Sequence, residues 1–356
     1  MTYETDDLRI ESLNELSSPK SVREEIPISD EVASIVYNSR LALSKILDFE
    51  DDRLILIVGP CSIHDPKSAL EYAKRLKSLE TKHSNQLKIV MRVYFEKPRT
   101  TIGWKGLIND PNLDNSYDVN SGLRKARKVL LDINNLGLPA GTEFLDMITP
   151  QYLADLISWG AIGARTTESQ IHRELASGLS CPVGFKNSTN GSIQVAIDAI
   201  GSASNSHIFL SITKEGKSAI FNSSGNEDCH VILRGGSDTN YESSFVESTS
   251  KELEAAKKSK NIMIDMSHGN SKKQFKRQLI VNKDISDQIS SGENRIFGVM
   301  IESNLEEGNQ KIGPLEEIKY GQSITDACVG WNDTEIMINQ LSTAIENKRK
   351  KLHKSA

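Results

Sequence analysis

Eight short apolar runs recur along this chain, and stretches with a helical pattern separate most of them. Alternating strand and helix patterns predict parallel βαβ units, and eight such units can close into a barrel. The runs occupy residues 54–58, 89–93, 138–142, 161–164, 182–185, 231–233, 262–265 and 296–301. We therefore predict an α/β protein with the (β/α)8 TIM-barrel fold.

Each run ends in, or is soon followed by, a polar side chain that could take part in chemistry. The carboxyl ends of barrel strands meet at one mouth, where barrel enzymes have their active sites. The side chains are Cys61, Arg92, Lys97, Glu143, Arg165, Lys186, Arg234, His268 and Glu302. Any one of them could simply begin a polar loop, but the whole set is costly to crowd together without a ligand. We therefore expect an active site at this mouth.

The length and composition fit one barrel with extensions. The chain has 356 residues, of which 37% are hydrophobic, and a formal net charge of −5 at pH 7. A sizeable core is therefore possible, and no global field favours nucleic acid. The four cysteines show no disulfide framework, and neither a signal peptide nor a long apolar span is present. We expect a cytoplasmic protein with no nucleic-acid or membrane partner.

Two segments are more than a minimal barrel needs. Residues 1–50 form an N-terminal extension that begins with an acidic stretch, and such extensions can dock on a neighbouring subunit. Between residues 207 and 222, two strand-like runs flank the turn residues 214–217, which predicts an inserted β-hairpin. We expect a single domain over residues 1–356, with the barrel, including the hairpin, over residues 51–356.

A cation-rich segment follows the second apolar run and suits a phosphate group. It contains Lys97, Arg99 and Thr100 shortly after Arg92. Arginine forks onto oxygens and lysine adds a point charge. An ordinary basic loop is the alternative, but three further cations are expected from other strands, namely Arg165, Lys186 and Arg234. This number of cations favours two anionic groups or two phosphorylated substrates.

A second group of residues mixes the side chains that bind transition metals. It contains one thiol, one imidazole and two carboxylates, from Cys61, His268, Glu302 and Asp326. This combination predicts a site for a divalent ion such as Mn²⁺, Fe²⁺, Co²⁺ or Zn²⁺. A buried cysteine is more often inert packing, and His64 and His172 are rival ligands that sequence spacing does not exclude.

Several motifs closely resemble those of class I 3-deoxy-D-arabino-heptulosonate-7-phosphate (DAHP) synthases, and the resemblance covers nearly the whole chain. The motifs are residues 59–65, 97–101, 163–170, 184–187, 233–236 and 323–327. The resemblance implies a transferase that condenses phosphoenolpyruvate with D-erythrose 4-phosphate and water. The products would be DAHP and phosphate, in the first step of the shikimate pathway.

The resemblance also implies roles for individual residues. Cys61, His268, Glu302 and Asp326 match the metal ligands. The groups that hold phosphoenolpyruvate match Arg92, Lys97, Arg165, Lys186, Arg234 and the backbone N–H of Ala164, whereas Arg99 and Thr100 match the cradle for the aldose phosphate. Glu143 matches a carboxylate that positions water, and Asp326 also lies beside the substrate. We predict catalytic roles for Lys97, Glu143, Lys186 and His268; the general acid and base remain open among Lys97, Glu143, His268 and a water on the metal.

The family resemblance assigns the hairpin and the acidic extension to an allosteric pocket for an aromatic amino acid. The expected lining is Asp146, Met147, Pro150, Gln151, Leu175, Leu179, Ser180, Phe209, Ser211 and Ile212, with Asp6 and Asp7 from a neighbouring subunit. A dimer or a tetramer is therefore expected. The hydroxyl of Ser211 resembles phenylalanine-sensitive enzymes, whereas a glycine there would resemble tyrosine-sensitive ones, so phenylalanine is the predicted inhibitor. Alternatively, Phe209 and its neighbours only pack the hairpin on the barrel.

Two other functions are compatible with parts of this pattern. A synthase that uses a five-carbon aldose phosphate would share the barrel and the cations, but normally lacks the full 97–101 segment and the hairpin. A metabolite-sensing protein without turnover would normally show a broken metal or cation set. This chain has both sets in full.

Overall fold

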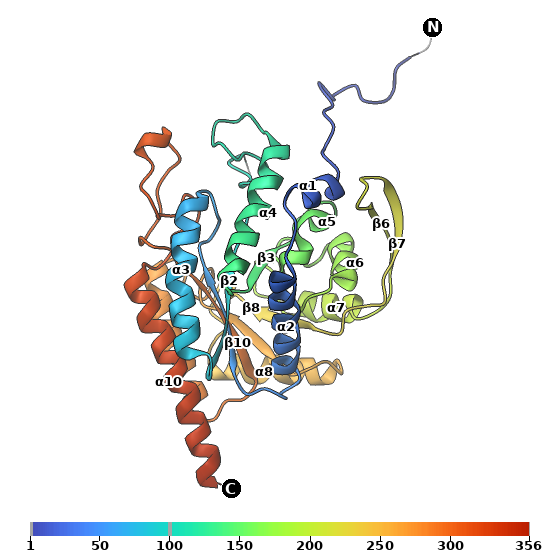
Figure 1. Cartoon of the computed structure of the whole chain (residues 1–356). Coiled ribbons are helices and arrows are strands. Elements are labelled where there is room, and N and C mark those ends of the chain that lie inside the picture. Colours follow the sequence, from blue (N-terminus) through green and yellow to red (C-terminus); the bar gives the residue numbers. More distant parts are fainter. Residues whose placement is uncertain (1–2, 99–101, 356) are drawn as a thin grey trace.

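The computed structural model describes residues 3–98 and 102–355, and its centre is a closed barrel of eight parallel strands (Figure 1). The strands are β1 (Leu54–Gly59), β2 (Leu87–Arg92), β3 (Ala140–Glu143), β4 (Trp159–Ile162), β5 (Val183–Lys186), β8 (Cys229–Leu233), β9 (Ile262–Asp265) and β10 (Ile296–Glu302). Their order around the barrel is β1-β10-β9-β8-β5-β4-β3-β2. The predicted (β/α)8 barrel is confirmed.

Helices pack around the outside of the barrel (Figure 1). They are α1 (Pro19–Glu25), α2 (Asp30–Leu47), α3 (Pro66–His83), α4 (Val119–Asn135), α5 (Pro150–Leu153), α6 (Gln170–Gly178), α7 (Gln194–Ala203), α8 (Ser243–Ala255), α9 (Gln278–Ser291) and α10 (Trp331–Ser355), with short 3₁₀ turns at 154–156, 275–277 and 315–317. Local sequence explains where they begin. The carboxylate of Asp65, for example, accepts hydrogen bonds from the backbone N–H groups of Lys67 and Ser68, and Pro66 occupies the first turn of α3.

The core has two layers because successive strand residues point to opposite faces. In β1, Leu54, Leu56 and Val58 pack against the outer helices, whereas Ile55 and Ile57 belong to the cluster inside the barrel. Leu43, Ile46 and Leu47 of α2 join that inner cluster. Ser44 of α2 also donates a hydrogen bond to Asp228, just before β8, so α2 covers the amino-terminal end of the barrel. The opposite end is left for the site.

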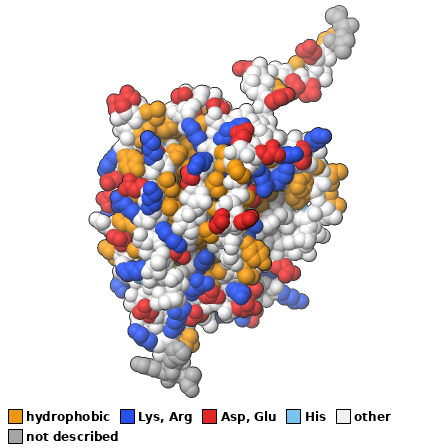
Figure 2. Space-filling model, in the orientation of Figure 1, with side chains coloured by type: hydrophobic (Ala, Val, Ile, Leu, Met, Phe, Trp, Pro, Cys, Tyr) orange, Lys and Arg blue, Asp and Glu red, His pale blue; other side chains and the backbone are white. Residues whose placement is uncertain are grey.

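The predicted hairpin is present as an antiparallel pair, β6 (Ile208–Ile212) and β7 (Ser218–Asn222), beside the barrel. Its inner face buries Phe209 and Ser211, whereas Ile208, Leu210 and Ile220 are exposed on its outer face. Figure 2 shows hydrophobic side chains exposed at this edge of the molecule and acidic and basic side chains intermingled over the visible face. Within the described residues, no helix is both long and apolar enough to span a membrane.

Candidate active site

A pocket of about 290 Å³ opens at the carboxyl ends of the barrel strands. Its lining includes Cys61, Arg92, Tyr94, Lys97, Pro98, Glu143, Gly163, Ala164, Arg165, Lys186, Arg234, His268 and Asp326. Glu302 adjoins this lining: its carboxylate is 3.0 Å from the guanidinium of Arg92, and only 2% of its side chain is exposed. The structure therefore brings together the strand-end residues singled out in the sequence. Arg99 and Thr100 lie outside the described residues.

Cys61 follows a point where the backbones of β1 and β2 approach each other closely. A Cβ added to Gly59 would lie 2.6 Å from the carbonyl oxygen of Arg92, so only glycine allows β1 to end against β2 at this point. The carbonyl groups of Pro60 and Cys61 then accept hydrogen bonds from the Arg92 guanidinium. This arrangement fixes the Cys61 thiol beside the pocket.

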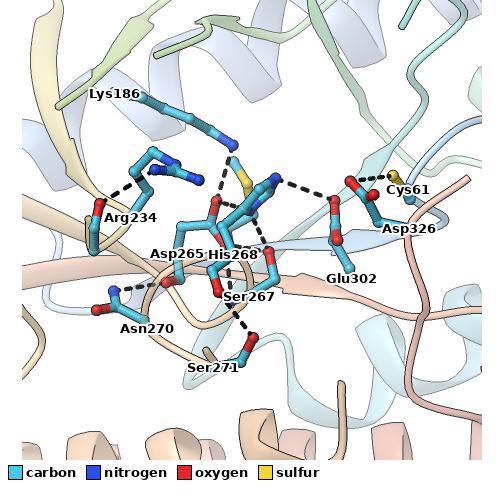
Figure 3. Close-up of polar contacts among 12 residues, drawn as sticks. Cys61, Lys186, Arg234, Asp265, Ser267, His268, Asn270, Ser271, Glu302 and Asp326 are labelled. Carbon is cyan, nitrogen blue, oxygen red and sulfur yellow. Dashed lines mark hydrogen bonds and ion pairs between the residues drawn. The ribbon is translucent and has the colours of Figure 1, made fainter. Parts of the chain in front are cut away.

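Three side chains form a group that could hold a metal ion. The donor atoms of Cys61, Glu302 and Asp326 all lie within 4.8 Å of one another (Figure 3). The ammonium of Lys97 lies 2.9 Å from the Cys61 sulfur and 2.7 Å from the Asp326 carboxylate. These nearby groups outweigh the effect of burial and raise the pKa of Lys97 above its ordinary value. A thiol and two carboxylates that already attract one cation fit a divalent ion.

His268 faces the same group with its ring held in one orientation. Its Nδ1 lies 2.9 Å from the Asp265 carboxylate and 2.6 Å from the Ser267 hydroxyl, and its Nε2 is 3.8 Å from Glu302 (Figure 3). A proton on Nδ1 shared with a carboxylate leaves the Nε2 lone pair free, as histidine ligands of metals require. His268 also has a positive φ of 55°, which costs free energy and brings its ring over the mouth. His268 lies outside the group of three whose ligand atoms are within 4.8 Å of one another, but its Nε2 is 3.8 Å from Glu302, so it is placed to add a fourth ligand.

The two rival histidines lie elsewhere. Both ring nitrogens of His172 are engaged, one with the Ser169 hydroxyl and one with the Leu145 carbonyl. His64 lines a different pocket, together with residues 111–113 and 318–320. Neither belongs to the group of possible ligands found among the described residues.

Asp265 is a site residue that the sequence analysis did not single out. Its side chain is fully buried and contacts Lys186 at 2.8 Å as well as His268. Burial opposes ionisation, but the charges of Lys186 and His268 outweigh it and hold the pKa of Asp265 well below its ordinary value. Its place as the last residue of an apolar run was the available signal, since a charge there faces either the core or the mouth.

Arg165 and Arg234 are the cations best placed to receive an anion. Within the described part of the chain, neither guanidinium forms an ion pair; Arg165 donates to the Pro98 carbonyl and Arg234 to the Gly235 carbonyl. Burial and the charge of Arg165 lower the pKa of Arg234. Two neighbouring cations that are not paired with a carboxylate favour the binding of an anion such as a phosphate group.

A second pocket, of about 530 Å³, lies between the hairpin and the barrel helices. Of the residues expected to form an allosteric pocket, Pro150, Gln151, Leu175, Leu179, Ser180, Phe209 and Ser211 line it. Asp146, Met147 and Ile212 do not line it, but the Ser211 hydroxyl donates to the Met147 carbonyl at 2.8 Å. Asp6 and Asp7 are exposed on an N-terminal arm that extends away from the body of its own chain (Figure 1).

The fold and this site define a barrel enzyme with a cation-lined pocket beside a group of possible metal ligands. A sequence model of the DAHP synthetase I family matches residues 25–339, and the chain belongs to that family. It is an enzyme of the 3-deoxy-7-phosphoheptulonate synthase class, as its relatives' names indicate.

The relatives match over almost their whole length. The Phe-sensitive phospho-2-dehydro-3-deoxyheptonate aldolase of Escherichia coli K12 is 59% identical over 349 residues, which cover 98% of this chain and 100% of that protein. A Trp-sensitive enzyme of Enterobacter agglomerans is 54% identical, with 97% and 99% covered. The solved structure of the Francisella tularensis SCHU S4 aldolase has a TM-score of 0.94 at 52% identity and covers 96% of this chain and 99% of its own.

Proposed function

We propose that this enzyme is a metal-dependent DAHP synthase that joins phosphoenolpyruvate to D-erythrose 4-phosphate with the addition of water and the release of phosphate. The observation that carries the proposal is the position of Arg165 and Arg234, which form no ion pair with any described residue, in the same pocket as Cys61 and Asp326 of the possible metal group. The family membership supports the same reaction. A binding protein without turnover would normally show a broken metal or cation set.

The chemistry explains why so many cations are gathered. Phosphoenolpyruvate carries a phosphate and a carboxylate, and its C3 attacks the aldehyde while C2 becomes electron-poor and accepts water. Arg165 and Arg234 would hold the phosphate and stabilise it as the C–O bond breaks. Lys186, whose ammonium is fixed by Asp265, would hold the remaining negative charge together with Arg92 and Lys97.

The other groups orient the reactants. Cys61, His268, Glu302 and Asp326 would hold the metal, which supplies a Lewis acid for the aldehyde oxygen. Glu143 would hold the water, and the Ala164 N–H would contact the phosphate. Arg99 and Thr100 would bind the phosphate of the aldose. Alignment of two substrates can supply roughly 7–11 kcal/mol of a reaction barrier.

We also propose phenylalanine as the feedback inhibitor and a dimer or tetramer as the active assembly. The pocket beside the hairpin has apolar walls from Leu175, Leu179 and Phe209 that suit an aromatic ring. The arm that carries Asp6 and Asp7 extends away from the body of its own chain (Figure 1), which suits a contribution to a neighbouring subunit. The relatives include both phenylalanine-sensitive and tryptophan-sensitive enzymes, so the inhibitor must be measured directly.

One assay tests the proposed reaction. Purified protein is incubated with phosphoenolpyruvate, erythrose 4-phosphate and Mn²⁺, and loss of the enol absorbance is followed together with phosphate release. We expect equal amounts of enol lost and phosphate released, with both stopped by a chelator and restored by excess Mn²⁺. Phosphate release without a seven-carbon product in the mass spectrum would contradict the proposal.

A further inference from the structure

Tyr94 joins the barrel core to the active-site pocket. It lies two residues beyond Arg92, the last residue of β2, and both residues line the pocket. The ring of Tyr94 belongs to the inner core cluster and lies under the Arg92 guanidinium, with the Cζ atom 3.6 Å from the ring centroid. Only 1% of the residue is exposed, yet it lines the pocket. Its ring is therefore part of the core, and the residue also contributes to the lining of the pocket.

The Tyr94 hydroxyl has no hydrogen-bond partner among the described residues, although it is buried. Buried tyrosine hydroxyls normally have one, and leaving one without a partner destabilises the fold. Two other buried tyrosines of this chain follow the rule: Tyr72 donates to Ser303 at 2.8 Å and Tyr152 to the Ser17 carbonyl at 2.6 Å. Among the buried side-chain atoms without partners in the described chain, Tyr94 Oη is the one whose residue lines this pocket.

A phenylalanine would fill the same core volume without that cost. The hydroxyl is thus best explained by a partner that comes with the substrates. Burial raises the pKa of Tyr94 well above its ordinary value, so the phenol stays neutral and both donates and accepts hydrogen bonds.

Glu143 is the candidate to share that partner, because it is the carboxylate whose charge acts most strongly on Tyr94. It lines the same pocket, and its charge acts on the Tyr94 phenol. A Cβ on Gly163 would lie 2.1 Å from Oε1 of Glu143, so the chain has left room for this carboxylate at this place. A bound water needs two or more polar partners, and a phenol next to a carboxylate supplies them.

We propose that the Tyr94 hydroxyl hydrogen-bonds the water that adds to C2 of phosphoenolpyruvate, and that it orients this water together with Glu143. This inference rests on the proposed DAHP synthase reaction. Tyr94 would act on the reacting water and not on the bound phosphoenolpyruvate itself, so its loss affects turnover and not substrate affinity.

The test compares Tyr94→Phe with the matched variant Tyr152→Phe, which removes a hydroxyl that is already hydrogen-bonded outside this pocket. For each protein we would measure kcat, the Kd for phosphoenolpyruvate by calorimetry, and the ligand-free thermal midpoint. For Tyr94→Phe we expect kcat to fall by about 10- to 100-fold, the usual effect of one lost hydrogen bond to a polar reacting group. Its Kd should be unchanged, and its thermal midpoint unchanged or higher. Tyr152→Phe should show a lower midpoint with wild-type kcat.

Three results would overturn the proposal for Tyr94. They are a wild-type kcat in Tyr94→Phe, a lowered midpoint that accounts for lost activity, and a weaker Kd that accounts for the whole loss in kcat/KM. Wild-type protein is assayed alongside. No turnover in the wild type contradicts the proposed reaction, whereas equal turnover in wild type and Tyr94→Phe contradicts the role of Tyr94 alone.

Discussion

Asp265 is fully buried and contacts Lys186 and His268 at the same time. Removing Lys186, the buried cation of this group, would leave an uncompensated charge and cost about 3–5 kcal/mol, whereas loss of His268 leaves Asp265 paired with Lys186. The strand-end cations could be predicted from sequence because each follows an apolar run. The roles of Asp265 and Tyr94 could not, because both residues belong to stretches that look like core. Their partners are distant in the chain and become neighbours only when the barrel closes.

The metal group predicts the effect of losing one ligand. Cys61→Ala or His268→Ala should abolish activity and most bound metal, with little change in the thermal midpoint, because both side chains lie at the mouth. His172→Ala is the control: its imidazole is bonded to Ser169 and Leu145, so metal content and kcat should be kept. The check is to measure kcat for each variant and to determine the number of metal ions per chain by mass spectrometry. A Cys61→Ala protein with normal metal content and rate would show the ligand assignment to be wrong.

Glu96 gives a pH-dependent prediction for stability. Burial and the nearby carboxylates of Asp146 and Glu143 raise the pKa of Glu96 to about 8, well above that of an unfolded chain. Between about pH 4.5 and pH 8, the folded protein therefore keeps a proton that the unfolded chain has lost. Because of this difference, Glu96 lowers the free energy of unfolding more and more as the pH rises through that range. Glu96→Gln should remove that loss.

Urea unfolding of both proteins at pH 5, 6.5 and 8 checks the Glu96 prediction. The free energy of unfolding of the variant, relative to wild type, should increase with pH, by at most about 1.4 kcal/mol per pH unit for one proton. A difference that stays constant across this range would contradict the assigned protonation of Glu96.

Among the secondary-structure elements, the strands were the most predictable because parallel barrel strands are buried on both faces and appear as continuous apolar runs. The boundaries of the strands were less predictable. β4 begins at Trp159, two residues before the expected run at 161, and the short helix α5 between β3 and β4 was not expected. Trp159 donates to His230 inside the barrel, a contact between distant residues that sequence periodicity does not reveal. The hairpin was predicted because a turn separates two short strands.

The hairpin carries the prediction on inhibitor choice. Ser211 of β6 donates its hydroxyl proton to the Met147 carbonyl. Ser211→Gly would free that carbonyl and make room for a phenol, so tyrosine should inhibit the variant about tenfold more strongly than it inhibits wild type, the worth of one hydrogen bond. Ser218→Gly, at an exposed position of β7, is the control for a glycine in the same hairpin. Inhibition constants of the wild type and both variants for phenylalanine, tyrosine and tryptophan check the prediction. A wild-type enzyme that tyrosine inhibits more strongly than phenylalanine does would refute the predicted selectivity.

For the whole molecule, the N-terminal arm exposes apolar side chains that a lone chain has no reason to display. Leu8, Ile10 and Leu13 are 67%, 61% and 85% exposed. We expect this arm to lie on a neighbouring subunit. Deleting residues 1–10 should abolish inhibition by phenylalanine and leave kcat unchanged, because Asp6 and Asp7 would no longer reach the second pocket.

Steady-state rates with and without phenylalanine check the effect of this deletion, and native mass spectrometry shows whether the assembly survives it. Inhibition must reflect a difference in affinity between two states of the assembly, with a typical coupling of roughly 1–3 kcal/mol. Undiminished inhibition after the deletion would exclude Asp6 and Asp7 from the inhibitor site.

The reaction proposed for this barrel joins phosphoenolpyruvate to a four-carbon aldose phosphate. The most direct test is kcat/KM for erythrose 4-phosphate and for arabinose 5-phosphate, measured with the same Mn²⁺-loaded enzyme at saturating phosphoenolpyruvate. We expect a higher kcat/KM with erythrose 4-phosphate and formation of the seven-carbon product. A higher kcat/KM with arabinose 5-phosphate would contradict it.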